Sequence, residues 1–211
     1  MIETLILPGL GGSGAGHWQR EWASRDAAAL VVEQEDWHRP VLAEWLHELE
    51  AQLIAAPGAV LVAHSLGCAL VAALAGRPAA SHVAGALLVA PADVAPLARS
   101  HADVRGFPEG PGERLPFPSI LVASRNDPFM SFRRAEDHAR AWGSALVDIG
   151  EAGHVNIDSG FGHWPDAVTL ATGLRGREAA PGGLSAHREA ARRWWTAVPG
   201  APGPVHDAGF G

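Results

Sequence analysis

The chain has 211 residues, 47% hydrophobic and 18% charged, which suits one domain with a substantial core. All 16 basic residues are arginines, because the sequence contains no lysine, and tyrosine is absent too. The absence of lysine excludes Schiff-base catalysis, pyridoxal phosphate attachment and a Walker-type phosphate site. A formal net charge of −7 argues against nucleic acid as a partner, since phosphate binding requires a concentrated cationic surface.

Histidine and cysteine usage narrows the chemistry further. Eleven histidines beside a single cysteine, Cys68, favour acid–base work and a serine nucleophile over thiol chemistry. No CxxC or paired His/Cys spacing typical of a zinc site occurs, and we expect no metal or other cofactor. Residues 1–4 carry no basic leader, and no run of about 18 uncharged apolar residues is present. We therefore expect a cytoplasmic protein without membrane contact.

Apolar runs and helical segments alternate along the first 174 residues. Continuous apolar runs predict buried strands at Thr4–Leu7, Val31–Val32, Ala59–Ala63, Ala84–Ala90, Ser119–Ala123 and Ala145–Ile149. Apolar spacing and composition predict helices at Leu42–Ile54, Leu66–Leu74 and Phe132–Trp142. Strands buried on both faces and alternating with helices predict an α/β fold, a mostly parallel sheet with helices on both faces.

Two segments depart from this alternation. Residues 101–118 are rich in proline and glycine and are predicted to form an irregular loop, a candidate flap over the site. We place one domain at 1–174, followed by 175–211, an arginine-rich helix at Leu184–Val198 and a disordered tail rich in proline and glycine. Trp194 and Trp195 on that helix are expected to dock on the body of the protein or, alternatively, on a partner.

Ser65 stands where an apolar strand gives way to a helix, in the sequence Ala63-His64-Ser65-Leu66-Gly67. This pattern is close to GxSxG, with alanine in place of the first glycine. In α/β-hydrolases such a nucleophile elbow holds the serine in a strained turn above the sheet. We predict that Ser65 is a nucleophile and that His64, beside it, points away.

A serine nucleophile needs a base, and the base needs a carboxylate to orient it. Asp127 follows the strand at Ser119–Ala123 and His154 follows the strand at Ala145–Ile149, in the order Ser, Asp, His that α/β-hydrolases use. Because carboxyl ends of parallel strands share one edge, the three side chains are predicted to meet there. Asp93 is the alternative acid and His163 the alternative base.

The oxyanion formed on attack needs preorganised backbone donors. We predict the N–H of Leu66, directly after Ser65, and that of Leu10, in the glycine-rich loop after the first strand. That loop also contains Gly9, Gly11 and Gly14 in GxGxxG spacing, which leaves a nicotinamide-dependent oxidoreductase as an alternative.

Taken together, these residues resemble the small serine hydrolases of the YdeN and retinoblastoma-binding-protein type within the α/β-hydrolase superfamily. The resemblance rests on the elbow, on His17-Trp18-Gln19 with Trp22, and on Gly153-His154-Val155-Asn156 with the residues that follow, and it covers about 2–174. It implies an α/β-hydrolase fold without a large cap domain. Cys68 lies in Leu66-Gly67-Cys68-Ala69-Leu70, which lacks the glutamate of an LxCxE motif, so binding to retinoblastoma protein is not carried over.

The expected activity is hydrolysis of small carboxylic esters, amides or thioesters through Ser65, Asp127 and His154. The expected partner is a small acyl substrate; any protein partner is unknown. A rival hypothesis is a binding module that keeps this fold without turnover.

Overall fold

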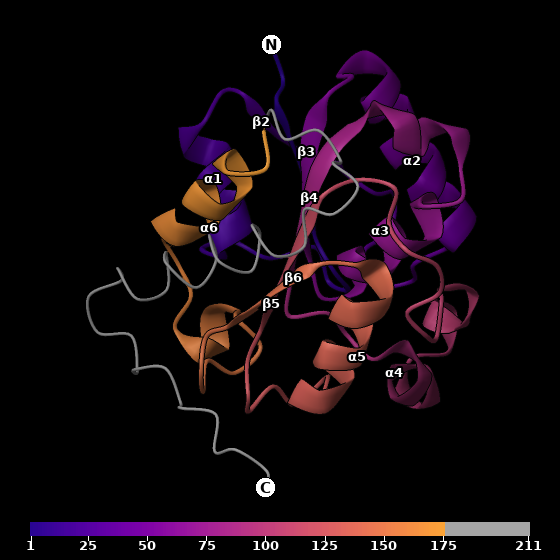
Figure 1. The fold of residues 1–211 in the computed structure, drawn as a ribbon, viewed down its shortest axis with the longest axis vertical. Coiled ribbons are helices and arrows are strands. Elements are labelled where there is room, and N and C mark those ends of the chain that lie inside the picture. The colour runs from indigo at the N-terminus through magenta and orange to yellow at the C-terminus, as the bar shows by residue number, and fades with distance from the viewer. Residues whose placement is uncertain (176–211) are drawn as a thin grey trace, which may run out of the picture.

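The computed structural model describes residues 1–175, so the predicted helix at 184–198, Trp194 and Trp195 lie outside the described residues (Figure 1). The strands are β1 (Thr4–Leu7), β2 (Ala29–Val31), β3 (Ala59–His64), β4 (Val83–Val89), β5 (Ser119–Ala123) and β6 (Ala145–Asp148). The α-helices are α1 (Trp18–Arg25), α2 (Leu42–Ala55), α3 (Leu66–Leu74), α4 (Val94–Ser100), α5 (Phe132–Trp142) and α6 (Pro165–Thr172). Short 3-10 helices occupy Pro78–His82, Ala102–Gly106 and Ile157–Ser159.

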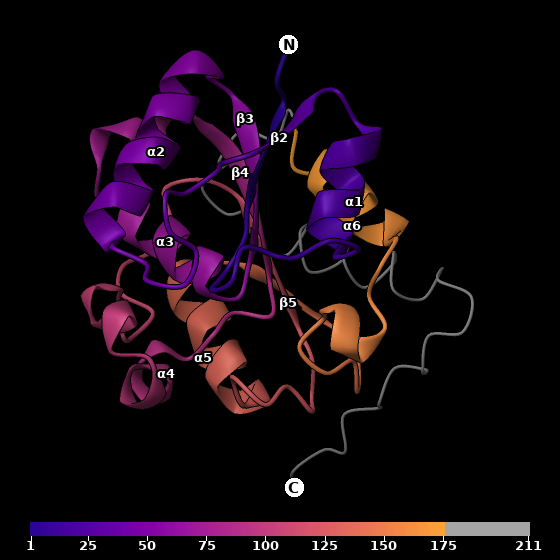
Figure 2. The same ribbon diagram turned by 180° about the vertical axis from the view of Figure 1, so that it is seen from behind.

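All six strands lie in one parallel sheet with the order β2-β1-β3-β4-β5-β6. Helices α1 and α6 cover one face, and α2, α3 and α5 cover the other (Figures 1 and 2). This confirms the predicted α/β fold with helices on both faces. Within residues 1–175 no separate cap domain stands over the sheet.

The sheet separates two apolar cores because successive side chains of a strand point to opposite faces. In β3, Val60 and Val62 pack in the cluster with Trp18 of α1. Leu61 of the same strand packs in the other cluster, with Leu49 of α2. Side chains on both faces of the central strands are therefore buried. This explains why the strand sequences are continuous apolar runs rather than alternating apolar and polar residues.

Local sequence also fixes where helices begin and end. In α5, the side chain of Ser131 accepts from the N–H of Arg134 and caps the amino terminus. Gly143 ends that helix with φ +72°, a left-handed conformation that glycine adopts without strain. Helices α1, α4 and α6 are not among the predicted helices, because each is only about two turns long and offers little periodicity to detect.

The segment 101–118 is more ordered than predicted. Its residues Ala102–Gly106 form a 3-10 helix, so the prediction of an irregular loop is wrong there. Phe107 packs edge-on against Trp45 of α2, and the indole N–H of Trp142 in α5 donates to the carbonyl of Pro111. These contacts attach the segment to α2 and α5. Its role as a flap stays a prediction.

None of the helices within residues 1–175 combines the length and hydropathy needed to cross a bilayer.

Candidate active site

Ser65 occupies the sharp turn between β3 and α3. Its backbone lies at φ +54° and ψ −120°, outside the regions that L-residues prefer, as expected for a strained elbow. Gly67 allows this turn, because a Cβ there would lie 2.3 Å from the carbonyl oxygen of Leu7. Alanine at position 63, in place of the first glycine of the motif, is fully buried and accommodated.

The glycine-rich loop after β1 passes directly beside the elbow. A Cβ on Gly9 would lie 2.8 Å from Cβ of Ser65 and 3.0 Å from the backbone nitrogen of Leu66. Close approach to Ser65 thus accounts for this glycine without a dinucleotide. In the dinucleotide fingerprint the glycine loop opens directly into a helix, whereas here α1 begins at Trp18, four residues after Gly14.

Ser65, His154 and Asp127 converge at the carboxyl edge of the sheet. Nε2 of His154 lies 2.9 Å from Oγ of Ser65. Nδ1 of the same ring lies 2.9 and 3.0 Å from the two carboxylate oxygens of Asp127. The Nδ1–H group therefore donates to Asp127, which leaves the Nε2 lone pair to accept the hydroxyl proton of Ser65.

Burial and a second hydrogen bond hold the carboxylate in place. The side chains of Asp127 and His154 are 3% and 8% exposed. The N–H of Phe129 also donates to Oδ1 of Asp127, and the Phe129 ring packs on the imidazole of His154 with centroids 4.4 Å apart. Phe129 itself is 45% exposed, so the imidazole of His154 lies beneath a ring that contacts solvent.

The alternative acid and base are engaged elsewhere. Asp93 forms an ion pair with Arg134 of α5, and both of its carboxylate oxygens accept a hydrogen bond. His163 is exposed, and its Nδ1 lies 2.6 Å from the guanidinium of Arg25. The geometry thus favours Asp127 and His154 over both.

The predicted oxyanion donors, the backbone N–H groups of Leu66 and Leu10, belong to residues at or next to the elbow, and their role stays a prediction. Leu66 begins α3 directly after Ser65, and Leu10 follows the glycine that touches the elbow. Within residues 1–175, neither N–H donates to a protein acceptor. Ser13 in the same loop donates to the amide of Gln19, whose nitrogen in turn donates to the carbonyls at the ends of β1 and β3.

Side chains beyond the predicted triad hold the loop that carries His154. The N–H of Ala152 donates to Ser124 Oγ, and that of Gly153 donates to Asn126 Oδ1. Ser124 and Asn126 belong to the same loop as Asp127, so the loops of the acid and the base are tied together. Nothing in the local sequence indicates these bonds, which join residues 28 and 27 positions apart.

The side chain of His64 lies against the loop of His154. Its imidazole centroid lies 4.8 Å from that of His154, and its Nε2 donates to the carbonyl oxygen of His154 over 2.8 Å. Burial, followed by the nearby His154 and His17, holds the pKa of His64 well below its usual value, so the ring is neutral. That the ring points away from Ser65 stays a prediction; its contact with His154 arises because the loop of His154 folds back over the end of β3.

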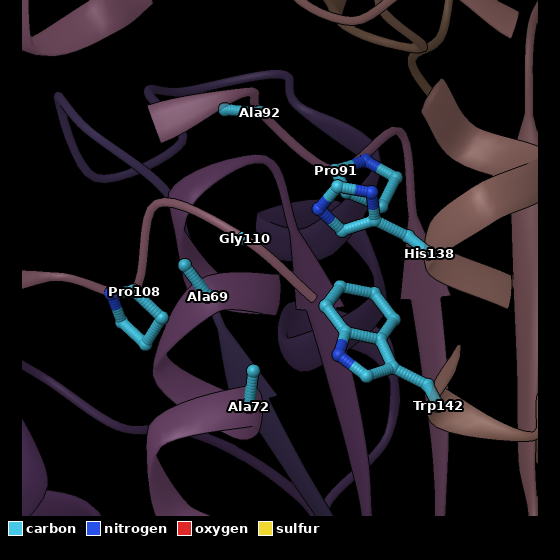
Figure 3. A pocket seen from close by; sticks show the side chains of 8 residues that line it. All are labelled: Ala69, Ala72, Pro91, Ala92, Pro108, Gly110, His138 and Trp142. Atoms are coloured by element: carbon cyan, nitrogen blue, oxygen red, sulfur yellow. The ribbon is translucent and has the colours of Figure 1, made fainter. Parts of the chain in front are cut away.

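A small cavity of about 10 Å³ lies apart from these residues, with room for about one water molecule (Figure 3). Its walls come from α3, from α5 and from the loops after β4 and around Gly110. The lining residues include His138 and Trp142 but none of Ser65, Asp127 and His154. It is therefore a packing defect between helices rather than a place for an acyl chain.

Comparison with known proteins gives a consistent assignment. The chain matches a family model described as serine hydrolase over residues 4–172. No curated protein matches. Among solved structures, a putative YdeN-like hydrolase from Pectobacterium atrosepticum is 32% identical, with a TM-score of 0.70 over 83% of this chain and 93% of that one.

Two more distant structures share the fold. The ydeN gene product of Bacillus subtilis is 22% identical, with a TM-score of 0.66 over 84% of this chain and all of that one. Esterase 2 of Thermogutta terrifontis is 15% identical, with a TM-score of 0.61 over 84% of this chain and 86% of that one. With the family match and the YdeN-like neighbour, they show that the chain belongs to the serine hydrolase family and has the α/β-hydrolase fold.

Proposed function

We propose that this protein hydrolyses small carboxylic esters through an acyl-enzyme on Ser65. The observation that carries the proposal is the imidazole of His154, which lies 2.9 Å from Ser65 Oγ on one side and 2.9 Å from Asp127 on the other. A base within this reach accepts the hydroxyl proton as Oγ attacks, and the carboxylate keeps the imidazole in the required tautomer.

The reaction then follows from the positions of the donors. Attack on the ester carbonyl gives a tetrahedral oxyanion, which the N–H groups of Leu66 and Leu10 stabilise. The protonated His154 gives its proton to the leaving alcohol as the acyl-enzyme forms. A water molecule, deprotonated by His154, attacks the acyl-enzyme, and the departing Ser65 oxygen recovers that proton.

Small esters are favoured because no separate cap domain within residues 1–175 encloses a long acyl chain. The fold relatives described above include a protein named as an esterase. Thioesters and amides require the same attack and differ in the leaving group.

The test compares the native chain with Ser65→Ala on p-nitrophenyl acetate and butyrate, with Ser81→Ala as the matched control. Ser81 is exposed, and its hydroxyl donates only to the carbonyl of Pro78. We expect Ser65→Ala to lose activity and fluorophosphonate labelling, while Ser81→Ala keeps both. Equal rates for Ser65→Ala and the native chain would favour the binding module. A panel of esters, thioesters and amides then ranks the substrate classes.

A further inference from the structure

Two consecutive carbonyl groups in the loop of His154 are each bound by a buried aromatic N–H group. The carbonyl of His154 accepts from Nε2 of His64 at 2.8 Å, and the carbonyl of Val155 accepts from Nε1 of Trp18 at 2.9 Å. We propose that His64 and Trp18 are positioning residues, which hold the backbone at His154 so that its imidazole meets Ser65. This inference rests on the proposed function.

The backbone on the other side of His154 is also fixed. Its N–H donates to Ser159 Oγ at 3.0 Å, so hydrogen bonds restrain the peptide groups before and after this residue. Once both peptide groups are fixed, only the two side-chain torsions of His154 remain free. Asp127 restrains those torsions by binding Nδ1. The orientation of the imidazole is thus determined by the backbone of His154 and the carboxylate of Asp127 together.

The turn needs such restraint because its next residue is strained. Val155 has φ +51°, a left-handed conformation that is unfavourable for a β-branched side chain. Without donors for the carbonyls of His154 and Val155, relaxation of this strain would rotate the peptide groups that set the direction of the imidazole. Small displacements matter here, since misplacement of a reacting group by about 1 Å can lower a rate roughly 100-fold.

The two donors come from parts of the fold that do not move easily. His64 is the last residue of β3 and Trp18 the first of α1, and they are 5% and 1% exposed. His64 directly precedes Ser65, so its hydrogen bond ties the base's backbone to the nucleophile's own turn. Their rings also lie close together, with centroids 6.1 Å apart in an edge-on arrangement.

The test needs variants that remove or restore the donor at each position. His64→Leu and Trp18→Phe keep apolar bulk but lose the N–H group. His64→Gln places an amide N–H about as far along the side chain as Nε2 of histidine. The readouts are kcat and KM for p-nitrophenyl acetate and the rate of fluorophosphonate labelling of Ser65, beside a thermal melt of each variant.

The expected result is a loss in kcat and in labelling rate with little change in KM. His64→Leu and Trp18→Phe should each lower kcat roughly 10- to 100-fold. His64→Gln should recover most of the loss seen in His64→Leu. If His64→Leu fails to fold, Trp18→Phe decides the matter alone, because the indole ring is replaced by another aromatic ring.

Two matched controls separate positioning from general destabilisation. Trp22→Phe removes an indole N–H from the same helix, but that group donates to Asp26 and not to the loop of His154. His138→Leu removes a buried imidazole in α5 that donates to the carbonyl of Arg134. Both controls should keep the native kcat even where the melting temperature falls.

The inference is overturned if folded His64→Leu and Trp18→Phe keep the native kcat, if His64→Gln is no better than His64→Leu, or if the controls lose as much activity. The Ser65→Ala variant distinguishes failure of the positioning role from failure of the proposed function. An inactive Ser65→Ala beside a fully active His64→Leu overturns only the positioning role, whereas an active Ser65→Ala overturns the proposed function itself.

Discussion

Both carboxylate oxygens of Asp93 are bound by the guanidinium of Arg134, each over 2.9 Å. The ion pair joins the segment after β4 to α5, and Asp93 is thereby committed to structure. Asp127, which follows β5, binds Nδ1 of His154 instead. The two aspartates therefore form a matched pair, one with a structural partner and one with the candidate base.

The first prediction uses this pair. Asp127→Asn should lower kcat by about 10⁴-fold, because an amide no longer holds the imidazole in the tautomer that leaves Nε2 free to accept a proton. Asp93→Asn should keep kcat and lower only the melting temperature, since it breaks the ion pair with Arg134. Steady-state kinetics and thermal melts of both variants check this. Comparable losses of kcat in the two variants would contradict the assignment of Asp127.

The second prediction concerns the tight turn at the elbow. Gly67→Ala should destabilise the protein by about 1–3 kcal/mol or more, because the added Cβ would lie 2.3 Å from the carbonyl oxygen of Leu7. Gly76→Ala is the matched control, since a Cβ there meets no atom within 4 Å. Chemical denaturation measures both, and equal stabilities would show that the elbow tolerates the methyl group.

Much of the fold was predictable because the buried strands are continuous apolar runs, and each predicted strand corresponds to an observed one within about two residues. The candidate triad was predictable for a related reason: Ser65, Asp127 and His154 each lie in the turn or loop that follows such a run. Parallel strands bring their carboxyl ends to one edge whatever the loops between them do. Local pattern and topology sufficed for these three positions.

The supporting shell was not predictable from local pattern. Trp18 belongs to the signature on which the family resemblance rests, but its partner Val155 lies 137 positions away. Likewise, the bond from His64 to the carbonyl of His154 was not predicted, because nothing local indicates that the loop of His154 crosses the end of β3. Such contacts depend on how two loops pack against each other, and the local pattern of a single sequence does not indicate which loops do so.

The third prediction concerns stability in mild acid. Burial, followed by the nearby His154 and Arg20, lowers the pKa of His17 from 6.5 to about 4, and burial lowers the pKa of His64 and His138 as well. At a pH between the unfolded pKa of 6.5 and the folded pKa of about 4 for His17, the unfolded chain binds more protons than the folded one. The stabilising contribution is thus complete above pH 6.5 and is lost as pH falls towards 4.

Thermal melts across this range measure the effect. His17→Asn is the informative variant, because it removes one titrating group. At the start of α1 the side chain of His17 accepts a hydrogen bond from the N–H of Gln19, and the side-chain oxygen of asparagine can accept the same bond. Its melting temperature should fall less steeply with acid than that of the native chain. An identical slope would mean that His17 does not contribute.

The fourth prediction concerns the only cysteine. Cys68 is fully buried in α3, and burial raises the pKa of its thiol, because apolar surroundings disfavour the thiolate. The native protein should therefore not react with a thiol reagent such as 5,5′-dithiobis(2-nitrobenzoic acid), and one thiol should appear on denaturation. Rapid reaction of the native chain would contradict the packing of α3.

Among the strands of residues 1–175, β6 pairs only with β5 and forms one edge of the sheet. Because His154 follows β6, Ser65 acquires its base only when this marginal strand has joined the rest. During refolding, fluorophosphonate reactivity should consequently appear no earlier than the pairing of β6 with β5. A covalent inhibitor of Ser65 thus reports when the elbow and the loop of His154 have come together, which spectroscopic probes of compaction do not follow.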